Sequence, residues 1–161
     1  MPLLPTENLA VTCLASSLPP GLLVGNWCGL SDFLICPDET AFAVCLSGAA
    51  KFRAFSGSGV NDAWRGYHVS NVSLIADLSS AFSRYERDPE PGDLVVRDGG
   101  IYIATRPNVF GGHAGLVRWG DGTSLNEGAI TGGFSRWHVV FGEVPAQVTL
   151  LQIDSGEPSH E

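Results

Sequence analysis

Short apolar or alternating runs, separated by glycine, proline and small polar residues, recur along the whole chain. Residues 33–36 (FLIC) and 41–46 (AFAVCL) are apolar, with a proline and three polar residues between them, which is typical of two strands joined by a tight turn. Residues 51–55 (KFRAF) alternate polar and apolar side chains, as a half-buried strand does. Residues 67–76 (YHVSNVSLIA) predict one further strand. The remaining predicted strands cover residues 93–97, 101–105, 116–119, 137–141 and 147–153.

The strongest local signal is Asp98-Gly99-Gly100, between the strands predicted for residues 93–97 and 101–105. Glycine accepts the positive φ that a tight hairpin turn requires, so these strands should form a hairpin. A helix is predicted only for residues 77–85 (DLSSAFSRY), about two turns long, with Asp77 as its N-cap. Many short strands and at most one or two short helices predict a mainly β fold, an antiparallel sandwich or barrel.

The size of the chain, 161 residues and 17.0 kDa, predicts a single β-rich domain over residues 1–161, with loose tails at residues 1–8 and 155–161. Hydrophobic residues make up 44%, which excludes wholesale disorder. The apolar stretch at residues 9–25 follows Glu7 and is broken by two prolines, so we expect mature structure there and not a signal peptide or membrane span. The expected location is a virion or the cytoplasm.

The four cysteines, Cys13, Cys28, Cys36 and Cys45, form no CxxC pair, so a zinc ribbon is not expected. Free, buried thiols are the favoured interpretation, with one or two disulfides or a nucleophilic cysteine as alternatives. We expect Cys36 and Cys45 to be buried on neighbouring strands. No histidine pair has a metal-ligand spacing, and no phosphate-binding glycine loop is present, so the sequence predicts neither a metal site nor a cofactor.

Residues 91–95 (PGDLV) and 112–122 (GHAGLVRWGDG) together resemble the core of the NlpC-type cell-wall cysteine peptidases. The resemblance implies that His113 is the catalytic base and that an upstream cysteine, Cys45 or Cys28, is the nucleophile. A catalytic thiol is activated by a helix N-terminus and a nearby imidazole. In this chain Cys45 ends a strand-like run, Cys28 precedes one, and residues 101–105 insert an extra strand that the family lacks.

Residues 92–105 (GDLVVRDGGIYIAT) resemble hairpins of phage tail, fibre and head-attached proteins. This resemblance implies a non-enzymatic structural or binding module that contacts protein subunits in an assembly, as a homo-oligomer. Three aromatic residues are candidates for stacking on a glycan: Trp64, Tyr67 and Trp119. The alternatives are an NlpC-like cysteine hydrolase and an acidic, immunity-type inhibitor of a basic toxin.

Seventeen acidic and nine basic residues give a formal net charge of −8, and the eight arginines are scattered along the chain. We therefore predict no measurable affinity for duplex DNA at physiological salt, and no affinity for anionic membranes, because ordinary DNA binding uses about six to ten phosphate contacts. A gel-shift titration checks the first part. Micromolar, salt-sensitive binding would contradict it, as would a fold that gathers most of the arginines on one face.

Overall fold

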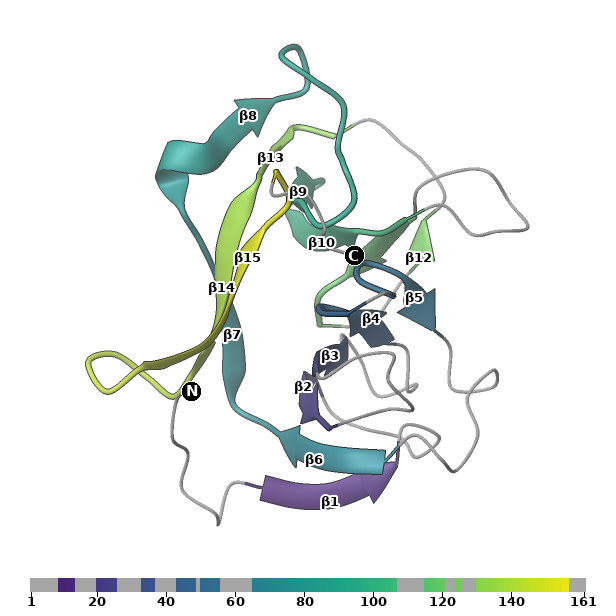
Figure 1. The fold of residues 1–161 in the computed structure, drawn as a ribbon. Coiled ribbons are helices and arrows are strands. Elements are labelled where there is room, and N and C mark those ends of the chain that lie inside the picture. The colour runs from purple at the N-terminus through teal and green to yellow at the C-terminus, as the bar shows by residue number, and fades with distance from the viewer. Residues whose placement is uncertain are drawn as a thin grey trace.

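The structure is a computed structural model that describes residues 9–13, 20–25, 33–36, 43–48, 50–55, 65–106, 115–120, 124–125 and 130–156, and the statements below concern these residues. They form a mainly β fold in which every strand pair is antiparallel, which confirms the fold class. The strands form three open sheets (Figure 1). Each sheet ends at two edge strands within the described part of the chain.

The first sheet contains six strands in the order β1-β6-β2-β3-β4-β5. The predicted pair of apolar strands is confirmed, since β3 and β4 are adjacent and antiparallel. Its strands are β1 (Leu9–Cys13), β2 (Gly21–Val24), β3 (Phe33–Cys36), β4 (Ala43–Cys45), β5 (Ala54–Phe55) and β6 (Arg65–Val69).

The second sheet also contains six strands, in the order β12-β11-β10-β9-β13-β8. Its centre is the predicted hairpin, which is confirmed: Arg97 pairs with Gly100 across a two-residue turn in which Asp98 and Gly99 have φ of 49° and 75°. Its strands are β8 (Ala81–Ser83), β9 (Leu94–Arg97), β10 (Gly100–Ala104), β11 (Leu116–Arg118), β12 (Ser124–Leu125) and β13 (Gly132–Phe134).

The third sheet contains three strands in the order β15-β14-β7. They are β7 (Val72–Ala76), β14 (Arg136–Phe141) and β15 (Val148–Asp154). A bulge places one extra residue, Leu150, in β15 between the partners of Val139 and Val140. Side chains alternate across this sheet, so one face carries Trp137, Val139 and Ile153 into the core and the other carries Arg136 and His138 outward.

The main core lies where the three sheets meet. Its buried side chains come from all of them: Leu22, Val44 and Val69 from the first sheet, Leu94, Ile103 and Val117 from the second, and Trp137, Val139 and Ile153 from the third. A smaller apolar cluster lies on the other face of the second sheet, around Val95, Tyr102, Leu116 and Ile130. The second sheet is therefore covered on both faces.

The chain passes between sheets at two short corners. Ser70 and Asn71 separate β6 from β7, and Ser135 alone separates β13 from β14. The single strand predicted for residues 67–76 is therefore wrong: it is two strands in different sheets. Asn71 has φ 58°, a left-handed conformation that asparagine tolerates better than most residues, and this ends β6 before β7 begins.

Two further local predictions are wrong. Residues 77–85 form no α-helix; Asp77 does cap, but it caps a single 3-10 turn, η3 (Leu78–Ser80), after which β8 continues as a strand. Strand pairing to β13 replaces the helical hydrogen bonds there. The strand predicted for residues 51–55 is confined to Ala54–Phe55, because Lys51 and Phe52 form a turn in which Phe52 has φ 68°.

Several expectations fall partly on the chain outside the described residues. Cys45 is a fully buried thiol on β4 that forms no disulfide, next to the strand that carries Cys36, as expected for Cys45; the Cys36 side chain is not described. The tail predicted at residues 1–8 lies outside, as do residues 157–161 of the other tail. Ser155, at the start of that second tail, is hydrogen-bonded through its backbone N–H to the carbonyl of Ser135.

Gly92 and Gly99 provide a matched pair for testing backbone constraint. Both have positive φ, 94° and 75°, but a Cβ on Gly92 would overlap the Phe52 ring, whereas a Cβ on Gly99 would have no atom within 4 Å. We predict that Gly92→Ala lowers the free energy of unfolding by about 3 kcal/mol or more, and that Gly99→Ala lowers it by only about 1 kcal/mol from backbone strain. Urea denaturation of the two variants measures both values. Equal losses would contradict the packing assigned to Gly92.

Candidate functional site

A buried carboxylate lies at the junction of the second and third sheets. Asp93 precedes β9 and is fully buried, and Arg87 binds both of its oxygens, with Nη1–Oδ2 at 2.8 Å and Nη2–Oδ1 at 3.1 Å. The backbone N–H of Glu90 donates to Oδ2 at 2.7 Å, and the Ser155 hydroxyl donates to Oδ1. Four donors thus satisfy a charge that would otherwise be costly to bury. We call Asp93, Arg87, Glu90 and Ser155 the Asp93 network.

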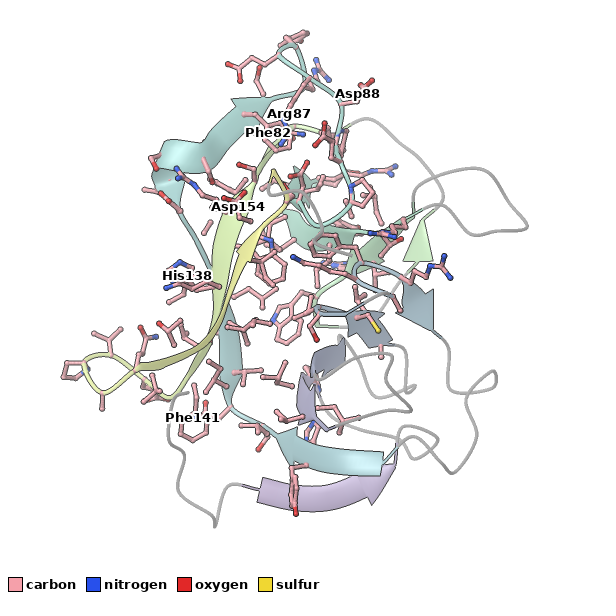
Figure 2. All side chains as sticks on the ribbon, in the orientation of Figure 1. Phe82, Arg87, Asp88, His138, Phe141 and Asp154 are labelled. Atoms are coloured by element: carbon pink, nitrogen blue, oxygen red, sulfur yellow. The ribbon has the colours of Figure 1, made fainter. Side chains whose placement is uncertain are left out.

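The cation of the network is held on its other side by an aromatic ring. The Arg87 guanidinium lies 3.7 Å from the centroid of the Phe82 ring (Figure 2). The hydrogen bonds to Asp93 raise the pKa of Arg87 above its ordinary value. Arg87 and Asp93 therefore form a bidentate structural ion pair.

Gly92 extends the same junction toward the first sheet. Its carbonyl accepts a hydrogen bond from the buried indole of Trp137 at 2.7 Å. The Phe52 ring packs directly on its Cα side, where only a hydrogen leaves room. One dipeptide, Gly92-Asp93, thus contacts side chains from both of the other sheets.

A second polar cluster lies on the surface, around the 3-10 turn. Asp77 accepts hydrogen bonds from the backbone N–H of Ser79 at 2.9 Å and from its hydroxyl at 2.6 Å. Arg136 lies 3.4 Å from the Asp77 carboxylate and donates to the Ser79 hydroxyl at 2.8 Å. The hydrogen bonds from Ser79 hold the pKa of Asp77 below its ordinary value, with Arg136 and His138 adding favourable charge. Each member of this cluster is already engaged with another.

His138 lies on the same outer face as this cluster and points away from the core (Figure 2). It is half-buried on β14, between Ile75 of β7 and Gln152 of β15. The Ser79 hydroxyl donates to the Asp77 carboxylate and accepts from Arg136. The serine, histidine and carboxylate therefore do not form the hydrogen-bonded chain of a nucleophilic triad.

The residues that the cysteine-peptidase resemblance implies are only partly described. Cys45 is fully buried and is the last residue of β4, where it pairs with Leu34 of β3, so it does not stand at the helix N-terminus that activates a catalytic thiol. Cys28 and His113 lie outside the described residues. Asp93, within the PGDLV motif, is engaged in the structural network above.

The two candidate glycan-binding aromatics that the structure describes, Tyr67 and Trp119, belong to different sheets. Tyr67 is half exposed on β6 of the first sheet, and Trp119 follows β11 of the second sheet, where it is partly buried against the main core. Trp64 lies outside the described residues. Within the described part of the chain, no group of three histidine, cysteine, aspartate or glutamate side chains is arranged to hold a metal ion. The described residues also contain no helix long and apolar enough to cross a membrane.

A family model described as "Uncharacterised protein y4lG" matches residues 14–161. The chain belongs to the y4lG family. The match to the y4lG model spans β2 to β15, and so includes the Asp93 network and the surface cluster around Asp77. The match leaves both resemblances, to phage virion modules and to NlpC-type peptidases, untested.

One similar protein of the y4lG family is "Uncharacterized protein y4lG" of Sinorhizobium fredii. It is 29% identical over 116 residues, which cover 71% of this chain and 70% of that protein. No solved structure matches this chain.

The sequence did not predict either polar cluster as a unit. Arg87 and Asp93 are six residues apart in a proline-containing loop, and Ser155 is 62 residues further along, so only the fold brings the last member in. The sequence predicts Asp77 as a helix cap, but its ion-pair partner Arg136 comes from a strand 59 residues further along the chain. The sequence therefore identifies residues able to form hydrogen bonds, but it does not identify their partners from distant parts of the chain.

The contacts of the Asp93 network predict the order in which three substitutions lower the free energy of unfolding. Asp93→Asn leaves the Arg87 charge without its partner and should lower the free energy of unfolding by about 3 kcal/mol. Ser155→Ala removes one hydrogen bond and should cost about 1.5 kcal/mol. Asp88→Asn, an exposed carboxylate next to Arg87, is the control and should change stability by less than about 0.5 kcal/mol. Thermal and urea unfolding of the three variants gives the order; equal effects of Asp93→Asn and Asp88→Asn would refute it.

Proposed function

We propose that this protein is a non-enzymatic β-module that binds other protein subunits, as a component of an assembly. The observation that carries the proposal is the distribution of apolar side chains on its surface. Leu78, Tyr85 and Val144 are 77%, 82% and 79% exposed, although each is large. Exposed tyrosine is a common anchor of protein interfaces, and the exposed leucine and valine add apolar area that a partner can cover.

Tyr85 is the exposed side chain of these three that contacts a neighbouring cation. The guanidinium of Arg84 lies 4.7 Å from the centroid of its ring and donates to its hydroxyl, so the ring is held in place while it is exposed. Tyrosine and arginine are enriched among the residues that contribute most to binding, and a pre-ordered side chain loses less entropy when a partner covers it. The turn after β8 therefore presents an aromatic ring and a cation side by side.

The structural roles of two carboxylates also support a non-enzymatic module. The buried carboxylate of Asp93 and the exposed carboxylate of Asp77 both have arginine partners that fix them in structural roles. A virion, which the resemblance of residues 92–105 implies, is one setting for such a module, and a homo-oligomer is its simplest form.

The proposal can be tested with a photo-reactive amino acid, p-benzoylphenylalanine, placed at position 85 or 144 in the cells that naturally produce the protein. We predict covalent adducts to protein subunits, either copies of this chain or other proteins, from both positions. Position 152, an exposed glutamine on the polar face of β15, is the matched control and should give much less adduct. If positions 85 and 144 yield no more adduct than position 152, the proposed function is contradicted.

Thiol alkylation separates this proposal from the hydrolase alternative. A buried Cys45 should resist iodoacetamide in the native protein at neutral pH and react once the protein is unfolded. Rapid alkylation of Cys45 in the native protein would favour the hydrolase.

A further inference from the structure

The edge strands of the sheets differ in whether their outward backbone N–H and C=O groups are blocked. An edge strand carries a row of outward N–H and C=O groups that can pair with another chain, and proteins usually block that row with charges, bulges or local hydrogen bonds. Three edge strands have all of their side chains described: β7, β8 and β15. They can therefore be compared directly.

The edge formed by β8 is blocked. The hydrogen bond from Arg84 N–H to the Thr131 carbonyl fixes which residues face β13, so the backbone of Ala81 and Ser83 points outward. The Ala81 N–H already donates to the Leu78 carbonyl. Glu86 occupies both groups of Ser83, because its carboxylate accepts from the N–H and its own N–H donates to the carbonyl.

The edge formed by β15 is also poorly suited to pairing. The hydrogen bond from Ser155 N–H to the Ser135 carbonyl shows that the backbone of Gln152 and Asp154 points outward. The bulge at Leu150 interrupts the regular row of outward groups, and Asp154 places a carboxylate at its end. A bulge and a charge are two of the usual devices that discourage edge pairing.

The edge formed by β7 has none of these devices. Asp77 N–H donates to the Arg136 carbonyl, so Ser73, Ile75 and Asp77 face β14, and the backbone of Val72, Leu74 and Ala76 points outward. Those outward groups have no hydrogen-bond partner within the described residues. The strand, VSLIA, is regular and contains no charge and no proline.

We infer that the β7 edge pairs with the β7 edge of a second copy of this chain. This inference rests on the proposed function and names the partner and the surface. An antiparallel pair centred on Leu74 would place Val72 opposite Ala76 of the other copy and join two three-stranded sheets into one, with about six new backbone hydrogen bonds. The arrangement is two-fold symmetric, as the contact between two identical chains usually is.

The sequence of β7 favours a second copy as the occupant, because the strand is uncharged and can pair with itself. Each chain carries a formal net charge of −8, which opposes association over long range, so a contact between two copies has to form through an uncharged surface. β7 is such a surface, and the centred register sets Ser73 opposite Ile75, with no like-charged pair on the strand. Apolar side chains are also exposed on this stretch: Ile75, Leu78 and Tyr67 account for three of the six large apolar side chains exposed among the described residues.

The test introduces charges at positions 73 and 75, whose side chains point outward from the core and are exposed. In the proposed register each introduced charge faces a like charge on the other copy. The double variant Ser73→Lys/Ile75→Lys and the double variant Ser73→Glu/Ile75→Glu should each weaken dimerisation roughly tenfold or more. An equimolar mixture should restore a mixed dimer, because lysine then faces glutamate.

The measurement is the mass in solution by light scattering and sedimentation over a range of concentrations. The unchanged protein should reach twice the 17.0 kDa of one chain. Thr149→Lys/Gln152→Lys adds the same charge to the same outer face at the β15 edge, and should leave the dimer unchanged. Far-UV circular dichroism confirms that each variant is folded, and recovery of the mixed dimer excludes misfolding as the cause of dissociation.

Two results would overturn the inference. One is a single-chain mass for the unchanged protein at high micromolar concentration, and the other is a dimer that persists in both charged variants. In either case photo-crosslinking at positions 85 and 144 still decides the proposed function separately, because neither position lies on β7.

Discussion

The junction at Gly92-Asp93 is the constraint on which the arrangement of the three sheets depends. The dipeptide precedes β9 in the second sheet, receives the Phe52 ring from the first, and binds Trp137 and Ser155 on the flanks of the third. Each contact is specific in a way that apolar packing is not: a glycine with no room for a Cβ, an indole N–H with one acceptor, and a buried carboxylate with four donors. The sheets are therefore positioned by directional contacts as well as by the shared core.

The same junction explains why so short a chain can divide its strands among three sheets. The chain leaves one sheet for the next within one or two residues, at Ser135 and at Ser70-Asn71. Connections of one or two residues make few contacts of their own, so contacts between side chains of different sheets have to fix how the sheets pack. Trp137 supplies such a contact from β14, and Ser155 supplies one from the residue after β15. Phe52 supplies a third from the turn between β4 and β5.

Sequence pattern predicted the fold class and most strands because alternation and turn chemistry are local. The prediction of a hairpin turn at Asp98-Gly99 is confirmed for that reason, because both residues tolerate the positive φ that they adopt. The pattern failed where tertiary contacts overrode local preference. Phe52 takes a left-handed φ that its side chain disfavours, and its burial against Gly92 offsets the strain. Residues 81–83 read as helix by spacing, yet they pair with β13.

The candidate sites were harder to predict for the same reason, since their members come from distant parts of the chain. The PGDLV motif contributes to the resemblance to cysteine peptidases, whereas in the structure its aspartate forms an ion pair with Arg87. Nothing in the motif itself indicates this network, because Ser155 and Phe82 are brought near only by the fold. A motif of common strand and turn residues therefore indicates a local backbone shape before it indicates chemistry.

Low charge content links these structural features to association. With charged residues at only 16% of the chain, this protein has few side chains to place along its sheet edges. At β8 it uses Glu86 and a carbonyl of the 3-10 turn, and at β15 a bulge and Asp154. β7 lies between the Asn71 corner and the Asp77 cap, and both polar residues stand at its ends and leave the strand itself uncharged. Among these three edges, two are blocked and the short third one is bare, which restricts where another chain can add to them.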